Sequence, residues 1–368
     1  MVWNRYKMLF REIIGQENLK AHLINSVKEN RIPHALLLWG NEGCGKLALA
    51  LATAQYLQCE NRQEHDSCGV CPTCRLMQNL THPDLHFAFP ITKEGSKTVC
   101  NDFMNSWREK VTENPYFSYK EWINTISNEK QGLIYSNESE EILRKLSLKS
   151  YSNGYKIMII WLAEKMHETC ANKLLKLIEE PPENTIFILI SEQPDIILPT
   201  IISRSQMIHV PVIDEVSLSK VVGNNIAHIA NGNYIKALEL SKEEYSNTDN
   251  LENYRSLMLC AYSKDLLTLK NWTDSMASRS REYIKDFLSY TQFITRECFI
   301  AHLQNSSLNY MISSEQAFSD KFKRFLTVDN IENIMELFNK ASRDISQNVN
   351  TKIVLFDLGI NLMTQIKK

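Results

Sequence analysis

The stretch that decides the fold is ALLLWGNEGCGKLALALATAQYL, residues 35–57. Its first five residues are apolar, which predicts a buried strand, and residues 47–57 are rich in leucine and alanine, which predicts a helix. Between them lies GNEGCGKL, residues 40–47, which matches the phosphate-binding pattern GxxxxGK[ST] except at its last position. The order strand, glycine turn, helix favours a true phosphate loop. The alternative is an ordinary glycine turn of an α/β protein.

The loop retains the residues of a phosphate cradle but lacks a magnesium ligand. Glycines at Gly40, Gly43 and Gly45 allow successive backbone N–H groups to face an anion, and Lys46 would reach the outer phosphates. The next residue is Leu47, where an active site uses a hydroxyl to hold magnesium. The loop therefore leaves ATP binding open and argues against magnesium-dependent hydrolysis.

A second strand lacks the acidic residues that hydrolysis needs. KIMIIWLAEKM, residues 156–166, reads as a strand, and Trp161 and Leu162 stand where an aspartate and a glutamate would steer magnesium and activate water. Glu164 comes two positions too late to replace them. Two independent losses thus affect the same reaction, metal-assisted hydrolysis.

Apolar runs along the chain predict a parallel sheet covered by helices, followed by helical regions. The expected strands are residues 35–39, 85–89, 157–162, 186–190 and 207–210. After residue 210 the patterns are helical, with a small lid expected at 212–244, a polar linker at 241–250 and an all-helical domain at 251–368. The fold class is therefore α/β, with a five-stranded parallel sheet and a helical C-terminal part.

Composition excludes some classes of protein. The 368 residues carry a net charge of −2, which points neither to nucleic acid nor to an anionic membrane surface. The N-terminus has no secretory pattern and no apolar run reaches the roughly 18 residues of a membrane span, so we expect a cytoplasmic protein without a membrane partner. In a reducing compartment, its nine cysteines indicate metal binding and burial rather than disulfides.

Four of the cysteines have the spacing of a metal site. Cys59, Cys68, Cys71 and Cys74 form the pattern Cx8Cx2Cx2C, in which two tight turns share Cys71. Four thiolates complete a tetrahedral structural zinc site with no position left for water. The alternatives are an iron–sulfur cluster or unliganded thiols. His65 lies within this segment, and we expect it on the surface because four thiolates already saturate zinc.

Several motifs together resemble the clamp-loader family of bacterial DNA polymerase III, and the resemblance is closest to its delta-prime branch. The motifs are IPHALLLWGNEGCGK, the four cysteines, THPDLHF, ANKLLKLIEEPPENTIFILISE and LPTIISRSQ, in this order. The resemblance covers most of residues 1–245. It is weaker in the C-terminal region, where ISQNVNTKIVLFDL is similar to the closing helix of the family.

The resemblance implies an architecture and a role. It implies an AAA+ module at 1–211 with a zinc module at 59–74, the lid at 212–244, and a collar at 251–368 that joins subunits into a hetero-oligomeric ring. It also implies a non-catalytic subunit of the polymerase III holoenzyme in DNA replication, with Arg204 as an arginine finger in trans for a gamma/tau-like motor subunit. Further implied partners are the delta subunit and, through the assembled complex, the sliding clamp and primed DNA.

Departures from the family pattern keep other interpretations open. Ser205 replaces a more common cysteine, Ile235 stands where active relatives have an arginine, and the insert at 93–150 is longer than expected and has no assigned role. The alternative function is an active gamma/tau-like motor ATPase of the same ring, so the chain's own enzymatic status stays uncertain. A zinc-dependent nucleic-acid-binding protein is a third interpretation. Arg204 could also be an ordinary surface or ion-paired arginine.

One expectation concerns the helical C-terminal part. Its residues Phe287, Tyr290, Phe293, Ile294 and Phe299 provide a large apolar surface. We expect part of this surface to face neighbouring subunits, and the alternative is that it forms the domain's own core.

Overall fold

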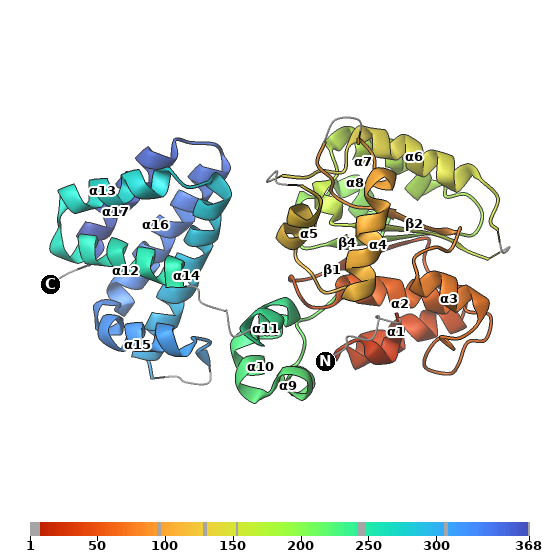
Figure 1. Ribbon diagram of the computed structural model, residues 1–368, viewed down its shortest axis with the longest axis horizontal. Helices are drawn as coiled ribbons and strands as arrows, with labels where there is room; N and C mark the ends of the chain where they lie inside the picture. The colour runs from red at the N-terminus through yellow and green to blue at the C-terminus, as the bar shows by residue number, and fades with distance from the viewer. Residues whose placement is uncertain are drawn as a thin grey trace. The chain divides into compact units, whose positions relative to one another are not determined.

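The structure is a computed structural model that describes residues 8–93, 97–127, 131–151, 154–241, 248–304 and 308–366. The chain divides into two compact units, Met1–Ser241 and Lys242–Lys368, each of which is described by itself (Figure 1). Most of the linker predicted at 241–250, namely residues 242–247, lies outside the described residues.

The first unit is built on a five-stranded parallel sheet. Its strands are β1 (Ala35–Trp39), β2 (Leu85–Ala88), β3 (Lys156–Trp161), β4 (Thr185–Ser191) and β5 (Gln206–His209). They are arranged in the order β2-β3-β4-β1-β5, and every neighbouring pair is parallel. In the centre of the sheet, Leu37 pairs with Leu189 on one side and with Met207 on the other. The predicted fold class is confirmed, and the predicted strand ends agree with the observed ends to within one residue.

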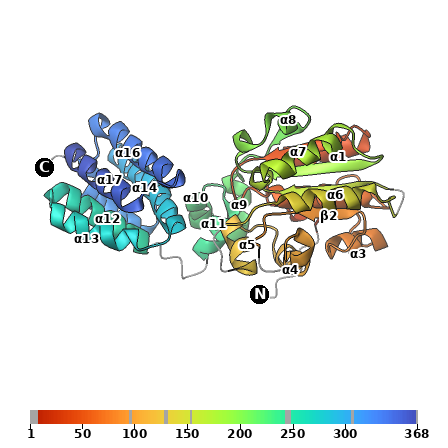
Figure 2. The ribbon, with the colours of Figure 1, turned by 90° about the horizontal axis from the view of Figure 1, so that it is seen from above.

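Helices cover the sheet on both sides, as Figures 1 and 2 show, with α6 and α7 above the strands of Figure 1 and α1 and α2 below them. The helices that accompany the sheet are α1 (Glu17–Lys28), α2 (Lys46–Gln58), α3 (Pro72–Gln78), α4 (Met104–Glu113), α5 (Tyr119–Ile126), α6 (Ser136–Ser147), α7 (Glu168–Glu179) and α8 (Pro199–Ile202), with short turns η1 (Phe10–Glu12), η2 (Cys100–Phe103), η3 (Ala163–Lys165) and η4 (Pro194–Ile196).

Helix α2 is the most enclosed of these helices. All 13 of its residues are buried, and the helix packs against β1, β3 and β4. A helix that is apolar on all sides must be covered on all sides. Because the phosphate loop leads directly into the first turn of α2, the packing of this helix also positions the C-terminal end of the loop.

Three short helices follow β5 in the region predicted as a lid. They are α9 (Glu215–Val222), α10 (Asn224–Ala230) and α11 (Tyr234–Ser241), and they belong to the first unit. Their packing on the phosphate loop is described below. That they act as a lid stays a prediction.

The described part of the second unit is helical. It contains α12 (Thr248–Ser263), α13 (Leu266–Ala277), α14 (Arg281–His302), α15 (Ser313–Phe322), η6 (Lys323–Phe325), α16 (Val328–Ser346) and α17 (Thr351–Gln365). Phe287 and Ile294 are completely buried in this unit's own core, Tyr290 is nearly so, and Phe293 and Phe299 are partly buried. Most of this apolar set therefore belongs to the unit's own core, and contact of its partly exposed members with neighbouring subunits stays a prediction.

No helix among the described residues has both the length and the hydropathy needed to cross a membrane.

Candidate functional site

The phosphate loop has the backbone that its sequence predicts. It connects the end of β1 at Trp39 to the start of α2 at Lys46. Gly43 and Gly45 adopt φ angles of 74° and 93°, a left-handed region that favours glycine. Gly40 continues the sheet, because its N–H donates to the carbonyl of Ser191 on β4 at 3.2 Å. The turn therefore retains its shape.

The ammonium group of Lys46 is bonded inside the loop. Its Nζ donates to the carbonyl oxygens of Gly40 at 2.8 Å and Asn41 at 2.5 Å. It also lies 3.6 Å from Oε1 of Glu192, which directly follows β4, and the lysine side chain is only 5% exposed. The group that would meet the outer phosphates thus has partners of its own.

An aromatic side chain from the insert covers the loop. A Cβ built on Gly45 would lie 3.1 Å from the ring of Tyr116, and the Tyr116 hydroxyl accepts a hydrogen bond from the N–H of Ile14 at 3.3 Å. Tyr116 is buried, and its ring meets Tyr234 of α11 edge to face with 4.9 Å between the centroids. Burial also raises the pKa of the Tyr116 phenol. The insert therefore contributes a buried contact to this site.

The loop is held from the α11 side as well. The N–H of Tyr234 donates to the carbonyl of Gly43 at 3.1 Å. A Cβ on Gly43 would come within 1.9 Å of Oδ1 of Asn233, and its φ of 74° also disfavours other residues, so a side chain here would strain the loop and displace Asn233. Ile235, the departure from the arginine of active relatives, is buried beside the loop.

Little space is left at the loop. The cavity there measures about 20 Å³ and is lined by Gly43, Gly45, Lys46, Leu47, Pro115, Tyr116, Phe117, Trp161, Glu192 and Ile235. Such a volume holds about one water molecule. The cavity between the loop, Tyr116 and Trp161 is therefore too small for a triphosphate.

Apolar side chains occupy the positions of the missing magnesium ligands. Leu47 is buried in the first turn of α2, and Leu162 is buried after β3. The ring of Trp161 packs against Phe117 and Trp107 of the insert, with centroids 5.1 Å and 5.4 Å apart. These three positions therefore supply neither a hydroxyl nor a carboxylate.

Acidic residues that the sequence analysis did not select lie close to the loop. Burial raises the pKa of the Glu192 carboxyl, and the positive charge of Lys46 partly offsets this rise. The pKa of Glu42 is raised to about 7, mainly by burial and next by the negative charge of Glu192. The carboxylate of Glu164 accepts a hydrogen bond from the N–H of Glu192 at 3.0 Å. Glu192 could have been found from its position directly after a buried strand. Tyr116 has no such signal.

The structure brings the four predicted cysteines together. Their ligand atoms all lie within 4.8 Å of one another, with 3.6 Å between the sulfurs of Cys59 and Cys68 and 3.9 Å between those of Cys68 and Cys74. Four sulfurs at about 2.3 Å from a zinc ion would be separated by about 3.8 Å. His65 lies outside this group with its side chain 84% exposed, as expected. The donor set fits a closed zinc site.

Short structural elements hold these thiols in place. Cys59 directly follows α2, Cys71 is the N-cap residue of α3, and Cys74 lies within α3. Backbone N–H groups point at the sulfurs, from Cys68 to Cys59 at 3.3 Å and from Cys74 to Cys71 at 3.4 Å. Such N–H groups favour thiolates, the form that binds a metal.

Arg204 lies apart from the residues that line the phosphate-loop cavity, between α8 and β5. Its guanidinium forms an ion pair with Glu179 at the end of α7 and donates to the carbonyl of Thr200 at 2.9 Å. Both partners of the ion pair are well exposed, at 37% and 41%. Arg204 is thus positioned at the surface rather than directed into this chain's own loop.

Known proteins resemble this chain over its first unit and beyond. Residues 15–214 match the family described as "DNA polymerase III, delta subunit". The chain is 30% identical over 185 residues to DNA polymerase III subunit delta' of Escherichia coli, covering 50% of this chain and 44% of that protein. It is 21% identical over 370 residues to DNA polymerase III subunit tau/gamma of Haemophilus influenzae, covering 94% of this chain and 48% of that protein.

The chain spans less than half the length of these two relatives. Among solved structures, a gamma subunit-related protein of Thermotoga maritima is similar with a TM-score of 0.42 and 14% identity, covering 93% of this chain and 99% of that one. The family match covers more than half of the 368 residues. The chain therefore belongs to the DNA polymerase III delta-subunit family of clamp-loader proteins.

Proposed function

We propose that this protein is a non-hydrolysing, delta-prime-like subunit of the DNA polymerase III clamp loader. The observation that carries the proposal is the filled phosphate loop, where Tyr116 covers Gly45, Asn233 covers Gly43 and the remaining cavity is about 20 Å³. A motor subunit needs this space for ATP, and it needs magnesium ligands where this chain has Leu47, Trp161 and Leu162. The gamma/tau-like motor is the alternative, since relatives of both kinds match.

The same proposal gives Arg204 a role in trans. Its present ion pair with Glu179 is exposed, and such pairs contribute about 0–1 kcal/mol. An arginine finger is worth roughly a thousandfold in rate, which corresponds to about 4 kcal/mol of transition-state stabilisation. The guanidinium can therefore leave Glu179 at small cost when a phosphoryl group of a neighbouring subunit is near.

The remaining roles follow from this assignment. The four-cysteine module would hold a structural zinc ion, and the second unit would be the collar of a hetero-oligomeric ring with motor subunits and delta. Contact with the sliding clamp and primed DNA would occur through the assembled complex, in DNA replication.

The proposal is tested by nucleotide binding and turnover of the purified full chain. We expect no saturable binding of a fluorescent ATP analogue with magnesium and no ATP hydrolysis above the level of a Lys46→Ala variant. Saturable turnover that Lys46→Ala abolishes would establish the motor alternative instead.

A further inference from the structure

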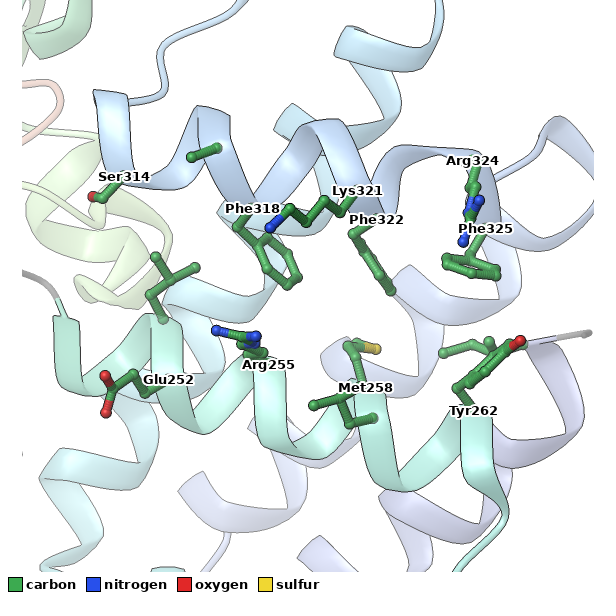
Figure 3. A pocket seen from close by; sticks show the side chains of 14 residues that line it. Glu252, Arg255, Met258, Tyr262, Ser314, Phe318, Lys321, Phe322, Arg324 and Phe325 are labelled. Atoms are coloured by element: carbon green, nitrogen blue, oxygen red, sulfur yellow. The ribbon is translucent and has the colours of Figure 1, made fainter.

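A groove crosses the surface of the second unit between α12 and the segment formed by α15 and η6 (Figure 3). Its volume is about 550 Å³, which is within the range of protein binding sites. Along α12 it extends from Leu251 to Tyr262, a distance of about 16 Å at 1.5 Å per residue. The groove is therefore long enough for about three helical turns.

The floor and one edge of the groove are apolar. Met258, Phe322 and Ile366 form part of the floor and are nearly buried. Leu259 and Tyr262 line the same groove but remain 56% and 36% exposed. Large apolar side chains left in solvent beside a groove are typical of a surface that binds another protein.

Three cations line the groove. Arg255 and Lys321 extend from opposite sides toward one end of it, and Arg324 lies near the other end beside Phe325 and Tyr262 (Figure 3). Within the described residues none of the three takes part in an ion pair; the pair formed nearby joins Lys323 to Asp320. Glu252 is the one acidic residue among the groove's lining. The groove thus carries an excess of positive charge above an apolar floor.

The aromatic rings of the groove are already packed against one another. Phe318 stacks on Phe322 with 5.2 Å between centroids, Tyr254 meets Phe322 edge to face at 5.9 Å, and Tyr262 packs on Phe325 at 5.1 Å. Bases of single-stranded nucleic acid need free ring faces on which to stack. An apolar floor between two helices instead suits the side chains of a third helix.

We propose that this groove binds an amphipathic helix of a partner protein, whose apolar stripe is flanked by aspartate or glutamate. The apolar side chains would enter between α12 and α15, covering Leu259 and Tyr262. The flanking carboxylates would pair with Arg255, Lys321 and Arg324. The inference rests on residues of the second unit alone and does not depend on whether the first unit binds or hydrolyses a nucleotide.

The test uses the full chain and a synthetic fluorescein-labelled helical peptide of about 15 residues, or about 22 Å. Its leucines are placed at i, i+3, i+4 and i+7, with glutamates beside this stripe. A second peptide replaces each glutamate with lysine. Fluorescence anisotropy gives the affinities, and hydrogen exchange locates the bound peptide. We expect the acidic peptide to bind, with protection of α12 and α15, and the lysine peptide to bind at least about tenfold more weakly.

Variants at exposed positions separate this proposal from loss of folding. Arg255→Glu should weaken the acidic peptide about tenfold and strengthen the lysine peptide, because reversing a charge reverses the preference. Leu259→Ser should weaken both peptides. The control is Lys270→Glu, an exposed lysine on α13 outside the groove, which should change neither affinity.

Several results would overturn the proposal. They are equal affinity for both peptides, no binding of the acidic peptide, protection away from α12 and α15, or displacement of the bound peptide by an oligothymidylate. Self-association of the chain that depends on concentration and is abolished by Arg255→Glu would assign the groove to a second copy of the chain. This result would also overturn the proposal.

Discussion

At the scale of single residues, the phosphate loop has the backbone turn of an anion cradle, but its lysine is bonded to the chain itself. Gly43 and Gly45 still turn as a phosphate loop turns, but Lys46 bonds to the carbonyls of Gly40 and Asn41 instead of an anion. The sequence predicted the missing ligands at Leu47 and Trp161. It could not predict Tyr116, because a contact between residues 45 and 116 depends on how the insert folds back.

Tyr116→Ala should open the loop. Removing a buried aromatic ring typically lowers the free energy of unfolding by about 3 kcal/mol or more. The space released lies against the glycines and Lys46, so we expect weak binding of pyrophosphate or ADP that the unmodified chain lacks, measured by calorimetry. Tyr254→Ala, which removes a buried tyrosine of the second unit, is the matched control and should destabilise without binding. If both variants fail to bind anions, the ring is not what closes the loop.

Glu42 should make stability depend on pH in a predictable direction. Its pKa is raised from 4.5 to about 7 in the folded chain, mainly by burial and next by Glu192. The folded state then binds more protons than the unfolded state between these values, so this group's contribution is favourable at low pH and is lost as pH rises toward about 7. Glu42→Gln should therefore gain stability relative to the unmodified chain as pH rises through this window.

Denaturant unfolding of both proteins at several pH values measures that difference. His86, whose pKa burial lowers to about 4, contributes with the opposite sign in an overlapping window. Comparison with Glu42→Gln removes this contribution, since both proteins contain His86. A difference between the two proteins that stays constant with pH would contradict the assigned shift.

At the scale of elements, local pattern predicted most of what was found. Strands such as β1 and β4 are continuous apolar runs with buried side chains on both faces, and such runs are recognisable without any knowledge of their neighbours. The close spacing of the cysteines likewise predicts their meeting. The sequence assigned no role to the insert, because Trp107 and Trp122 have aromatic partners at positions far away in sequence, Trp161 and Phe89.

The cysteine module should contain about one zinc ion per chain, and removing it should loosen this module first. The module supports η1, because the carboxylate of Asp66 accepts hydrogen bonds from the N–H groups of Phe10 and Arg11 at 3.1 Å and 3.2 Å. We therefore expect a strong chelator to increase hydrogen exchange in α3 and η1 while β1 and β4 stay protected.

Elemental analysis of the purified full chain checks the metal. Cys71→Ser should lower the zinc content, whereas Cys170→Ser, at an isolated buried cysteine of α7, should not. Iron with visible absorption would show that the cluster alternative holds instead.

At the scale of the whole molecule, the proposed function places Arg204 at the ATP site of a neighbouring motor subunit. Arg204→Ala, assembled with motor subunits, should leave zinc content and ring assembly unchanged and should slow clamp loading on primed DNA. Arg204→Lys should restore little, since lysine keeps the charge but loses the planar pair of donors. The matched control is Arg31→Ala, which removes another exposed arginine from an ion pair with a glutamate. Loading by the Arg204→Ala complex at the unmodified rate would make Arg204 a surface arginine only.

The aromatic packing of the insert on the phosphate loop also affects how many substitutions ATP hydrolysis would need in the proposed non-hydrolysing subunit. Leu47→Thr, Trp161→Asp and Leu162→Glu would supply the absent ligand types, but each would place a polar group among buried side chains, at a cost of about 1–3 kcal/mol for an unpaired hydroxyl and more for a carboxylate. None of these changes would move Tyr116 from Gly45. In the proposed non-hydrolysing subunit, ATP hydrolysis would therefore require several substitutions together, each of which is unfavourable on its own.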